Sequence, residues 1–518
     1  MEIAPKPLLV GKRASVSEAK FAYFEGDFER CLEICANIRM GSVATASEVA
    51  LLTARAFLRT GRAREAQNTI VDSLDNHRTL DASLTAQMLV ATARIRQDDP
   101  DTGIAILADA ASRAADAHFA VRSEIAFSTA LGYWAKREID TAESYLALVD
   151  PRTDIIHARA LDLQAWCYTA RRDYRRSAEA FQAALVRLDE CQAHDRTIAA
   201  TAISTLAIYA AELFDRDMAH FVDVRAQNID WSSGVTVQHY LTLAHQALFH
   251  EFDGNTVQAY QLATQAREHA PTAAFEVLGW GLSSAIARNA GERHSAIVFA
   301  KRAQQVLETI EEADLVGEER FALLAVAENC AHFEPERAAA LCARYFGLAP
   351  VDKMVVMSSD PRLTADETFI AGVIAQAQSE HARAEACYRQ AFEIFKSVGY
   401  LRRALHCAHA ILQISPDANL HDYIATHLAA RNNYVTAALA RGNGRLADLE
   451  RHPIVATLPA AQREVVTLLC LGKTNKEIAE LRHVGEQTIK NMLTKHVFRA
   501  FGVTSRAALV SACLRNVK

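Results

Sequence analysis

Apolar positions along this chain recur with the period of an α-helix. From about residue 15 to residue 441, apolar side chains return every three or four positions, so each segment carries one apolar face. Such segments come in pairs at intervals of roughly 35–46 residues, a period typical of helical-hairpin repeats. The pattern therefore predicts an all-α fold in which residues 1–441 form a solenoid of helical hairpins.

The clearest repeat spans residues 165–185. Within it, Ser177 and Ala184 are small enough to let two helices approach, while Tyr174 and Phe181 are placed to fill the groove between them. This unit resembles a tetratricopeptide repeat. Weaker copies, each with a turn followed by a small residue, occupy residues 26–31, 61–66, 254–259, 291–296 and 380–386.

Two segments interrupt the periodicity. Residues 349–366 contain two prolines and a serine pair, and this composition predicts a long loop. Residues 442–457 begin with Gly-Asn-Gly and contain a His-Pro pair, so we expect them to form an interdomain linker. Residues 458–518 are then a second domain.

The second domain has the pattern of four short helices. The first is expected over residues 460–471, and the second begins with a capping box formed by Thr474 and Glu477. The third covers Glu486–Phe501 and the fourth covers residues 506–514. A short helix, a tight turn and a longer helix with Lys490, Asn491 and Lys495 on its polar side make a helix-turn-helix.

Three motifs in this domain resemble the LuxR-type (GerE-like) DNA-binding family: GKTNKEIA at residues 472–479, EQTIKN at 486–491 and GVTSR at 502–506. The resemblance implies that Glu486–Phe501 lies in the major groove and that the fourth helix supports a homodimer on DNA. Carried over by position, the DNA-binding residues are Thr488, Lys490 and Asn491, with Lys476 and Arg506 near phosphates. We add Lys495 from the polar side of the third helix.

The domain also departs from the family pattern. Pro459 and Gln462 stand where the family has a threonine and an acidic residue, and Leu481-Arg482 is inverted against the usual order. The third helix is one residue longer between Ile489 and Gly502. Because one extra residue turns an α-helix by about 100°, the contacts of the family carry over by position before Leu493 but not to Lys495.

The charge of the chain is distributed unevenly. The whole sequence has 56 Lys and Arg against 62 Asp and Glu, a net charge of −6. Residues 458–518 have ten basic and four acidic residues, or +6, which leaves −12 for the rest. A small basic domain on an acidic body predicts that the domain binds a polyanion, here double-stranded DNA, and that the body does not.

Several function classes are disfavoured. The N-terminal residues lead into no long apolar run and no membrane-length span occurs, so we expect a soluble intracellular protein that contacts no membrane. The LuxR-type resemblance implies a bacterial, cytoplasmic protein. The ten cysteines form no CxxC pair, and the histidines lack zinc-site spacing. Leu471-Gly472-Lys473-Thr474 lacks the first glycine of a phosphate loop. We therefore expect no metal, no cofactor and no enzymatic activity.

The leading hypothesis is a transcription regulator whose helical repeats sense a peptide, protein or small-molecule signal, or mediate oligomerisation. A ligand could alter the DNA-binding module only by binding one arrangement of it better than another. The alternative is a helical-repeat scaffold whose terminal module no longer binds DNA specifically, as the departures in that module suggest. An enzyme built on the array is a third reading, although no nucleophile–base constellation supports it.

Overall fold

The computed structural model of the chain describes residues 14–24, 26–190, 195–231, 235–315, 317–348 and 361–428, and in the C-terminal region residues 453–470, 475, 478–479, 482, 484–503, 506, 508–509 and 512. In these ranges the regular structure is helical, and no strand occurs. None of the described helices is long and apolar enough to cross a bilayer.

The chain divides into two compact units, and the C-terminal module falls in the second. The first comprises residues 1–206 and 225–235, and the second comprises residues 207–224 and 236–518. The helices of the first unit are α1 (Val16–Phe24), α2 (Phe28–Ala36), α3 (Val43–Arg59), α4 (Ala63–Val71), α5 (Leu80–Arg96), α6 (Pro100–Arg113), α7 (Phe119–Ala135), α8 (Ile139–Leu146), α9 (Asp154–Ala170) and α10 (Tyr174–Glu190). Helices α11 (Arg196–Leu213) and α12 (Arg216–Ala226) have residues in both units.

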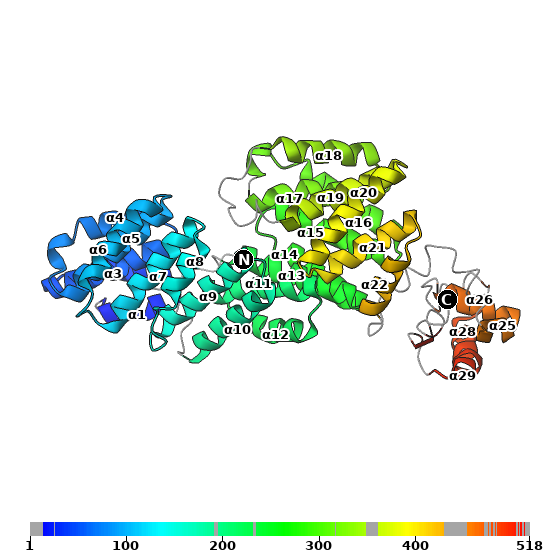
Figure 1. Cartoon of the computed structure of the whole chain (residues 1–518), viewed down its shortest axis with the longest axis horizontal. Helices are drawn as coiled ribbons and strands as arrows, with labels where there is room; N and C mark the ends of the chain where they lie inside the picture. The colour runs from blue at the N-terminus through cyan, green and yellow to red at the C-terminus, as the bar shows by residue number, and fades with distance from the viewer. Residues whose placement is uncertain are drawn as a thin grey trace. The chain divides into compact units, whose positions relative to one another are not determined.

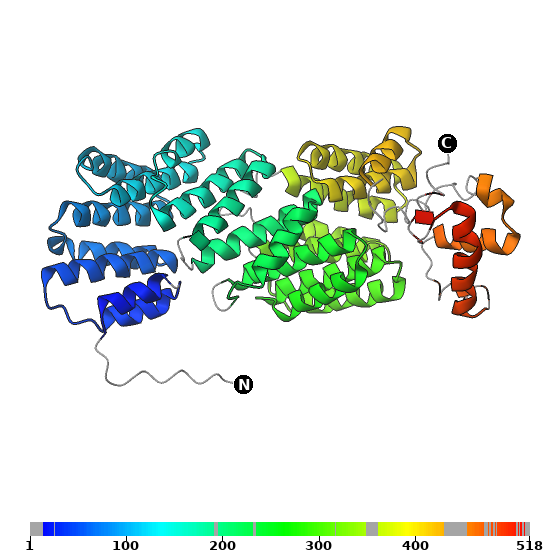
Figure 2. The same cartoon turned by 90° about the horizontal axis from the view of Figure 1, so that it is seen from below.

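The second unit continues the series of helical pairs. Its array helices are α13 (Thr236–Phe252), α14 (Thr256–Glu268), α15 (Ala273–Asn289), α16 (Arg293–Leu307), α17 (Phe321–Cys330), α18 (Pro335–Gly347), α19 (Pro361–Ala377), α20 (His381–Ser397), α21 (Leu401–Ile414) and α22 (Ala418–Leu428). Figures 1 and 2 show successive helices lying side by side. Within this series α9 packs on α10, and α15 packs on α16. This arrangement is the predicted helical-hairpin solenoid.

Each of the six predicted repeats turns at a residue with positive φ, two positions before its second helix. Such a residue ends a helix because its left-handed backbone directs the following amide to an earlier carbonyl. In the clearest repeat Arg172 has φ 64°, and the next amide, of Asp173, donates to the Tyr168 carbonyl at 3.0 Å. The corresponding residues of the other five are Gly26, Gly61, Gly254, Gly291 and Ser379.

The side chains predicted at the seam of that repeat are buried. Ser177, Phe181 and Ala184 are fully enclosed, and Tyr174 is 3% exposed. The ring of Phe181 also meets Trp166 edge-on, with 5.5 Å between centroids. The small and aromatic residues thus have the packing roles that the sequence pattern assigned to them.

The predicted loop over residues 349–366 is shorter than expected. Residues 349–360 lie outside the described part of the chain, but α19 begins at Pro361. Proline is tolerated in the first turn of a helix because its missing amide would have no helical partner there. Pro361 therefore starts a helix in a segment whose composition had suggested irregular structure.

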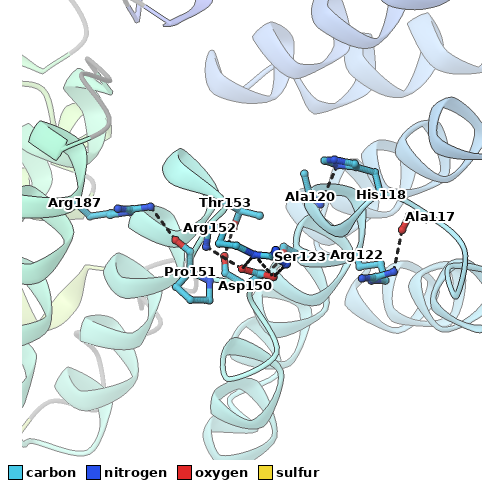
Figure 3. Close-up of polar contacts among 10 residues, drawn as sticks. All are labelled: Ala117, His118, Ala120, Arg122, Ser123, Asp150, Pro151, Arg152, Thr153 and Arg187. Atoms are coloured by element: carbon cyan, nitrogen blue, oxygen red, sulfur yellow. Dashed lines mark hydrogen bonds and ion pairs between the residues drawn. The ribbon is translucent and has the colours of Figure 1, made fainter.

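The loop between α8 and α9 is held by polar contacts on several sides (Figure 3). The Asp150 amide donates to Ser123 Oγ at 3.0 Å, and Asp150 accepts from the Arg152 guanidinium at 2.6 Å. Arg187 of α10 donates to the Pro151 carbonyl at 2.8 Å. These contacts fix the position of Arg152, whose guanidinium lies 4.6 Å from the centre of the Phe119 ring.

Candidate nucleic-acid interface

The C-terminal helices enclose a small core of their own. Their elements are α25 (Pro453–Thr457), α26 (Ala460–Cys470), α28 (Glu486–Met492), η4 (Leu493–Val497) and α29 (Phe498–Phe501), with further helical residues around 478 and 508. The core consists of Val455, Leu458, Val465, Val466, Leu469, Ile478, Ala479, Ile489, Leu493, Val497 and Leu509. It is formed by residues of this module, so the module has the apolar burial that folding requires.

The core begins earlier than the predicted domain boundary. Helix α25 lies inside the predicted linker 442–457, and its Val455 is fully buried against the other core residues. Residues 442–452 lie outside the described part of the chain. The last residues of the predicted linker are therefore part of the module.

The extra residue of the third helix coincides with a π-helical segment. Residues 486–501 are helical throughout, but Leu493–Val497 are wound as a π-helix between two α-helical stretches. A π-turn has an i→i+5 hydrogen bond and so accommodates one more residue per turn than the α-helix does. A turn of this kind has room for the one residue by which this helix exceeds the LuxR-type pattern.

The winding keeps the apolar face in register. Ile489, Leu493, Val497 and Phe501 are spaced four apart, and each such step drifts by about 40° on an ideal α-helix. In the structure Ile489 and Val497 are fully buried, Leu493 is 3% exposed, and Phe501 packs against the same core. Gly502 then ends the helix with φ 62°, as predicted. The polar face is therefore continuous along the segment.

Four of the predicted DNA-binding residues are exposed on this helix. Thr488, Lys490, Asn491 and Lys495 are all exposed, whereas Ile489 between them is buried. Lys490 pairs with Glu486 at 2.9 Å, and its side chain is 51% exposed. Because such an exposed pair is worth little, Lys490 can exchange it for a phosphate or a base edge at small cost.

The amide group of Asn491 already has a partner on the same face. Its Oδ1 accepts from Gln487 Nε2 at 3.3 Å, one helical turn earlier. The contact is exposed and long, so the amide can turn toward another donor and acceptor. An asparagine amide matches the hydrogen-bonding edge of adenine in the major groove.

Lys476 and Arg506 are the two residues expected near phosphates, and the structure describes only the second of them. Lys476 lies outside the described residues. Arg506 is partly buried, and its Nη1 donates to Asn475 Oδ1 at 3.4 Å. Arg506 thus joins the last helical residues of the module to the second helix.

Arg482 has a structural role that the sequence pattern did not reveal. Its Nε donates to Glu464 Oε2 of α26 at 3.0 Å, and its side chain is only 16% exposed. Nη1 also lies 4.0 Å from Met492 Sδ. The residue that departs from the family pattern therefore links the turn to the first and third helices of the module. Because Glu464 lies 18 positions away in the sequence, helical periodicity does not predict this contact.

Comparison with known proteins bears on this module. The sequence profile of the family described as "Sigma-70, region 4" matches residues 454–495. The match supports a helix-turn-helix DNA-binding fold at the C-terminus, from α25 into the π-helical segment. No curated protein sequence matches the chain.

Two solved structures are similar to the chain at low identity. A chain of the APC/C hetero-tetramer Cut9–Hcn1 is 12% identical with a TM-score of 0.29, covering 81% of this chain and 90% of that chain. A chain of Naa15/Naa10 bound to HypK-THB is 12% identical with a TM-score of 0.24, covering 97% and 99%.

Proposed function

We propose that this chain is a bacterial, cytoplasmic transcription regulator with a LuxR-type module behind an array of tetratricopeptide-like repeats. Residues 1–441 form the array, and residues 458–518, joined by α25, form the DNA-binding module. Glu486–Phe501 reads the major groove of double-stranded DNA, and the module binds as a homodimer. The array receives a peptide, protein or small-molecule signal.

The observation that carries this proposal is the division of the third helix into two faces. Ile489, Leu493 and Val497 are buried in the module, while Thr488, Lys490, Asn491 and Lys495 are exposed, with Lys490 beside the buried face. A helix anchored by one face and presenting Lys and Asn on the other has the geometry of a recognition helix. The net charge of +6 over residues 458–518 supports the same reading.

The proposal separates residues that read bases from residues that anchor the backbone. Asn491 and Lys490 lie on the first turns of the helix, where base edges are reachable. Lys476 precedes the turn and is assigned to the phosphate backbone, with Arg506. Lys490→Ala or Asn491→Ala should therefore cost about 1–3 kcal/mol of binding to the specific duplex and little on a scrambled one. Lys476→Ala should weaken both.

The experiment uses the full-length chain and a duplex selected from random-sequence DNA. Specific and scrambled duplexes are titrated with wild type, Asn491→Ala and the matched control Lys301→Ala, which removes an exposed lysine of the array. The control should bind like wild type. If Asn491→Ala weakened both duplexes equally, Asn491 would contact the backbone. If selection enriched no sequence, the chain would be a repeat scaffold whose module has lost specific DNA binding.

A further inference from the structure

The first unit contains a cavity that the proposed DNA-binding function does not use. Its volume is about 250 Å³, and it is lined from α1, α3, α5, α7, α9 and the start of α11, the first helices of consecutive hairpins. A wider hollow of about 1220 Å³ shares several lining residues with it, among them Tyr23, Arg55 and Arg159. The smaller cavity therefore adjoins an open hollow large enough for a ligand of ordinary size.

Four arginines line the small cavity: Arg55, Arg59, Arg96 and Arg159. Arg55 is engaged by Glu124, with Nη2 donating to Oε2 at 2.6 Å. The other three arginines have fewer carboxylate partners among the described residues, because Arg59 and Arg159 share one and Arg96 has none.

Arg59 and Arg159 share one carboxylate. Asp195, 5% exposed, accepts from Arg59 Nη2 at 2.5 Å and from Arg159 Nη2 at 3.3 Å. The Nε groups of both arginines have no hydrogen-bond partner among the described residues. Burial disfavours the ionised form of Asp195, but the two neighbouring guanidinium groups lower its pKa overall.

Arg96, the last residue of α5, has no carboxylate partner in the described part of the chain. Its Nη1 donates to the Leu58 carbonyl at 2.5 Å, and the residue, which is exposed, lines the small cavity. The low-dielectric surroundings and the neighbouring Arg59 and Arg159 lower the pKa of Arg96 to about 10. The site therefore holds like charges close together, an arrangement that a bound anion would relieve.

The third carboxyl group of the cavity does not restore neutrality. Burial and the neighbouring Asp195 raise the pKa of Asp162 to about 7, so near neutral pH it is only partly ionised. Four guanidinium groups thus face Glu124, Asp195 and a fraction of a third negative charge. The cavity has a net positive charge in an enclosed setting, where an unpaired charge is costly.

Apolar surface lies beside these charges. Trp134 and Trp166 line the small cavity. Phe21 and Phe24 border the open hollow and are 64% and 50% exposed. Arg152, held in the loop of Figure 3, also lines the hollow. A ligand suited to this site therefore has an anionic group at one end and an apolar body.

We propose that the cavity binds a small amphipathic organic anion, whose carboxylate or phosphate pairs with Arg96, Arg59 and Arg159 and whose apolar body lies against Trp134 and Trp166. The proposal gives a chemical class to the signal and rests on the proposed function only for its consequence at DNA. Binding itself involves the first unit alone. It is measurable without DNA, so failure of one claim is distinguishable from failure of the other.

The test measures binding of two probes, phenyl phosphate and benzoate, to the full-length chain by calorimetry and tryptophan fluorescence. Benzyl alcohol serves as the uncharged analogue. We expect at least one of the anions to bind with a dissociation constant in the millimolar range or below, and benzyl alcohol to bind at least about tenfold more weakly. Comparison of the two anions shows whether the site prefers phosphate or carboxylate.

Two matched variants locate the site. Arg96→Gln should weaken the affinity for the anion at least about tenfold, because it removes the guanidinium that lacks a carboxylate partner. Arg94→Gln, on the same helix but paired with Asp99 at 3.8 Å, should bind like wild type. Absence of binding by both anions up to about 10 mM would overturn the proposal. Equal binding of benzyl alcohol, or unchanged binding in Arg96→Gln, would overturn it as well.

Discussion

Replacement of Asp162 by asparagine should stabilise the first unit at alkaline pH. Asp162 lies on α9, and its Oδ1 is shielded from water without a hydrogen-bond partner among the described residues. Burial, with repulsion from Asp195, raises its pKa from 3.8 to about 7. The folded protein therefore keeps this proton over a range of pH in which the unfolded chain has lost it.

The sign of the effect follows from that order of pKa values. Between about pH 4 and pH 7 the folded state binds more protons than the unfolded state, so the free energy of unfolding falls as pH rises. Above the folded pKa the penalty is complete. A difference of about three pKa units corresponds to roughly 4 kcal/mol, and because the side chain is not fully enclosed we expect about 2–4 kcal/mol.

Urea unfolding of Asp162→Asn and wild type, followed by tryptophan fluorescence at pH 5 and pH 8, measures this difference. At pH 8 the free energy of unfolding of Asp162→Asn should exceed that of wild type by most of this amount, and at pH 5 by much less. Asp140→Asn is the control, because the Asp140 side chain is 94% exposed and its replacement should change little at either pH. The reasoning is refuted if Asp162→Asn is less stable than wild type at pH 8, or if its effect is the same at both pH values.

Three substitutions test the packing of the second unit. Gly372→Ala would place Cβ 2.7 Å from Cε1 of Tyr388, so overpacking of about 1–3 kcal/mol should exceed the helix-propensity gain in chemical denaturation. Arg402→Leu should cost about 3–5 kcal/mol by leaving the buried Glu212 carboxylate unpaired, and a second change of Glu212 to leucine should recover much of it. Ile489→Asp should unfold the module, abolishing DNA binding while the circular dichroism of the array persists.

The solenoid was predictable because each repeat contains local information. A turn residue, a small seam residue and a helical apolar face lie within a few positions of one another, as in residues 165–185. The structure places a positive-φ residue at all six predicted turns. Local patterns of this kind specify secondary structure and the packing of adjacent helices.

The sequence does not predict the π-helical segment itself and indicates only that the third helix has an unusual length. The sequence has one residue more between Ile489 and Gly502 than the LuxR-type pattern, so the position of Lys495 does not follow from that pattern. The four-residue spacing of Ile489, Leu493 and Val497 was the available signal, since it fits a wider turn better than an α-helix. That the extra residue winds into Leu493–Val497 depends on the core that holds those side chains.

The charged cavity could not be predicted from periodicity. Arg59 and its partner Asp195 are separated by 136 positions, and Arg402 and Glu212 by 190. Helical patterns place Arg59, Glu212 and Arg402 on helices and Asp195 just before one, but they do not predict which charges meet, either in this cavity or in the Arg402–Glu212 pair of the second unit. Such pairs depend on the stacking of hairpins that are distant in sequence.

The salt dependence of DNA binding tests the central claim most directly. The full-length chain is titrated with its selected duplex over a range of monovalent salt, and the logarithm of the binding constant is plotted against the logarithm of salt concentration. With four to six phosphate contacts per module, the predicted slope is about −3.6 to −5.4 per module, with the scrambled duplex bound more weakly throughout. A slope near zero, or equal binding of both duplexes, would contradict the assignment of this chain as a sequence-specific DNA-binding regulator.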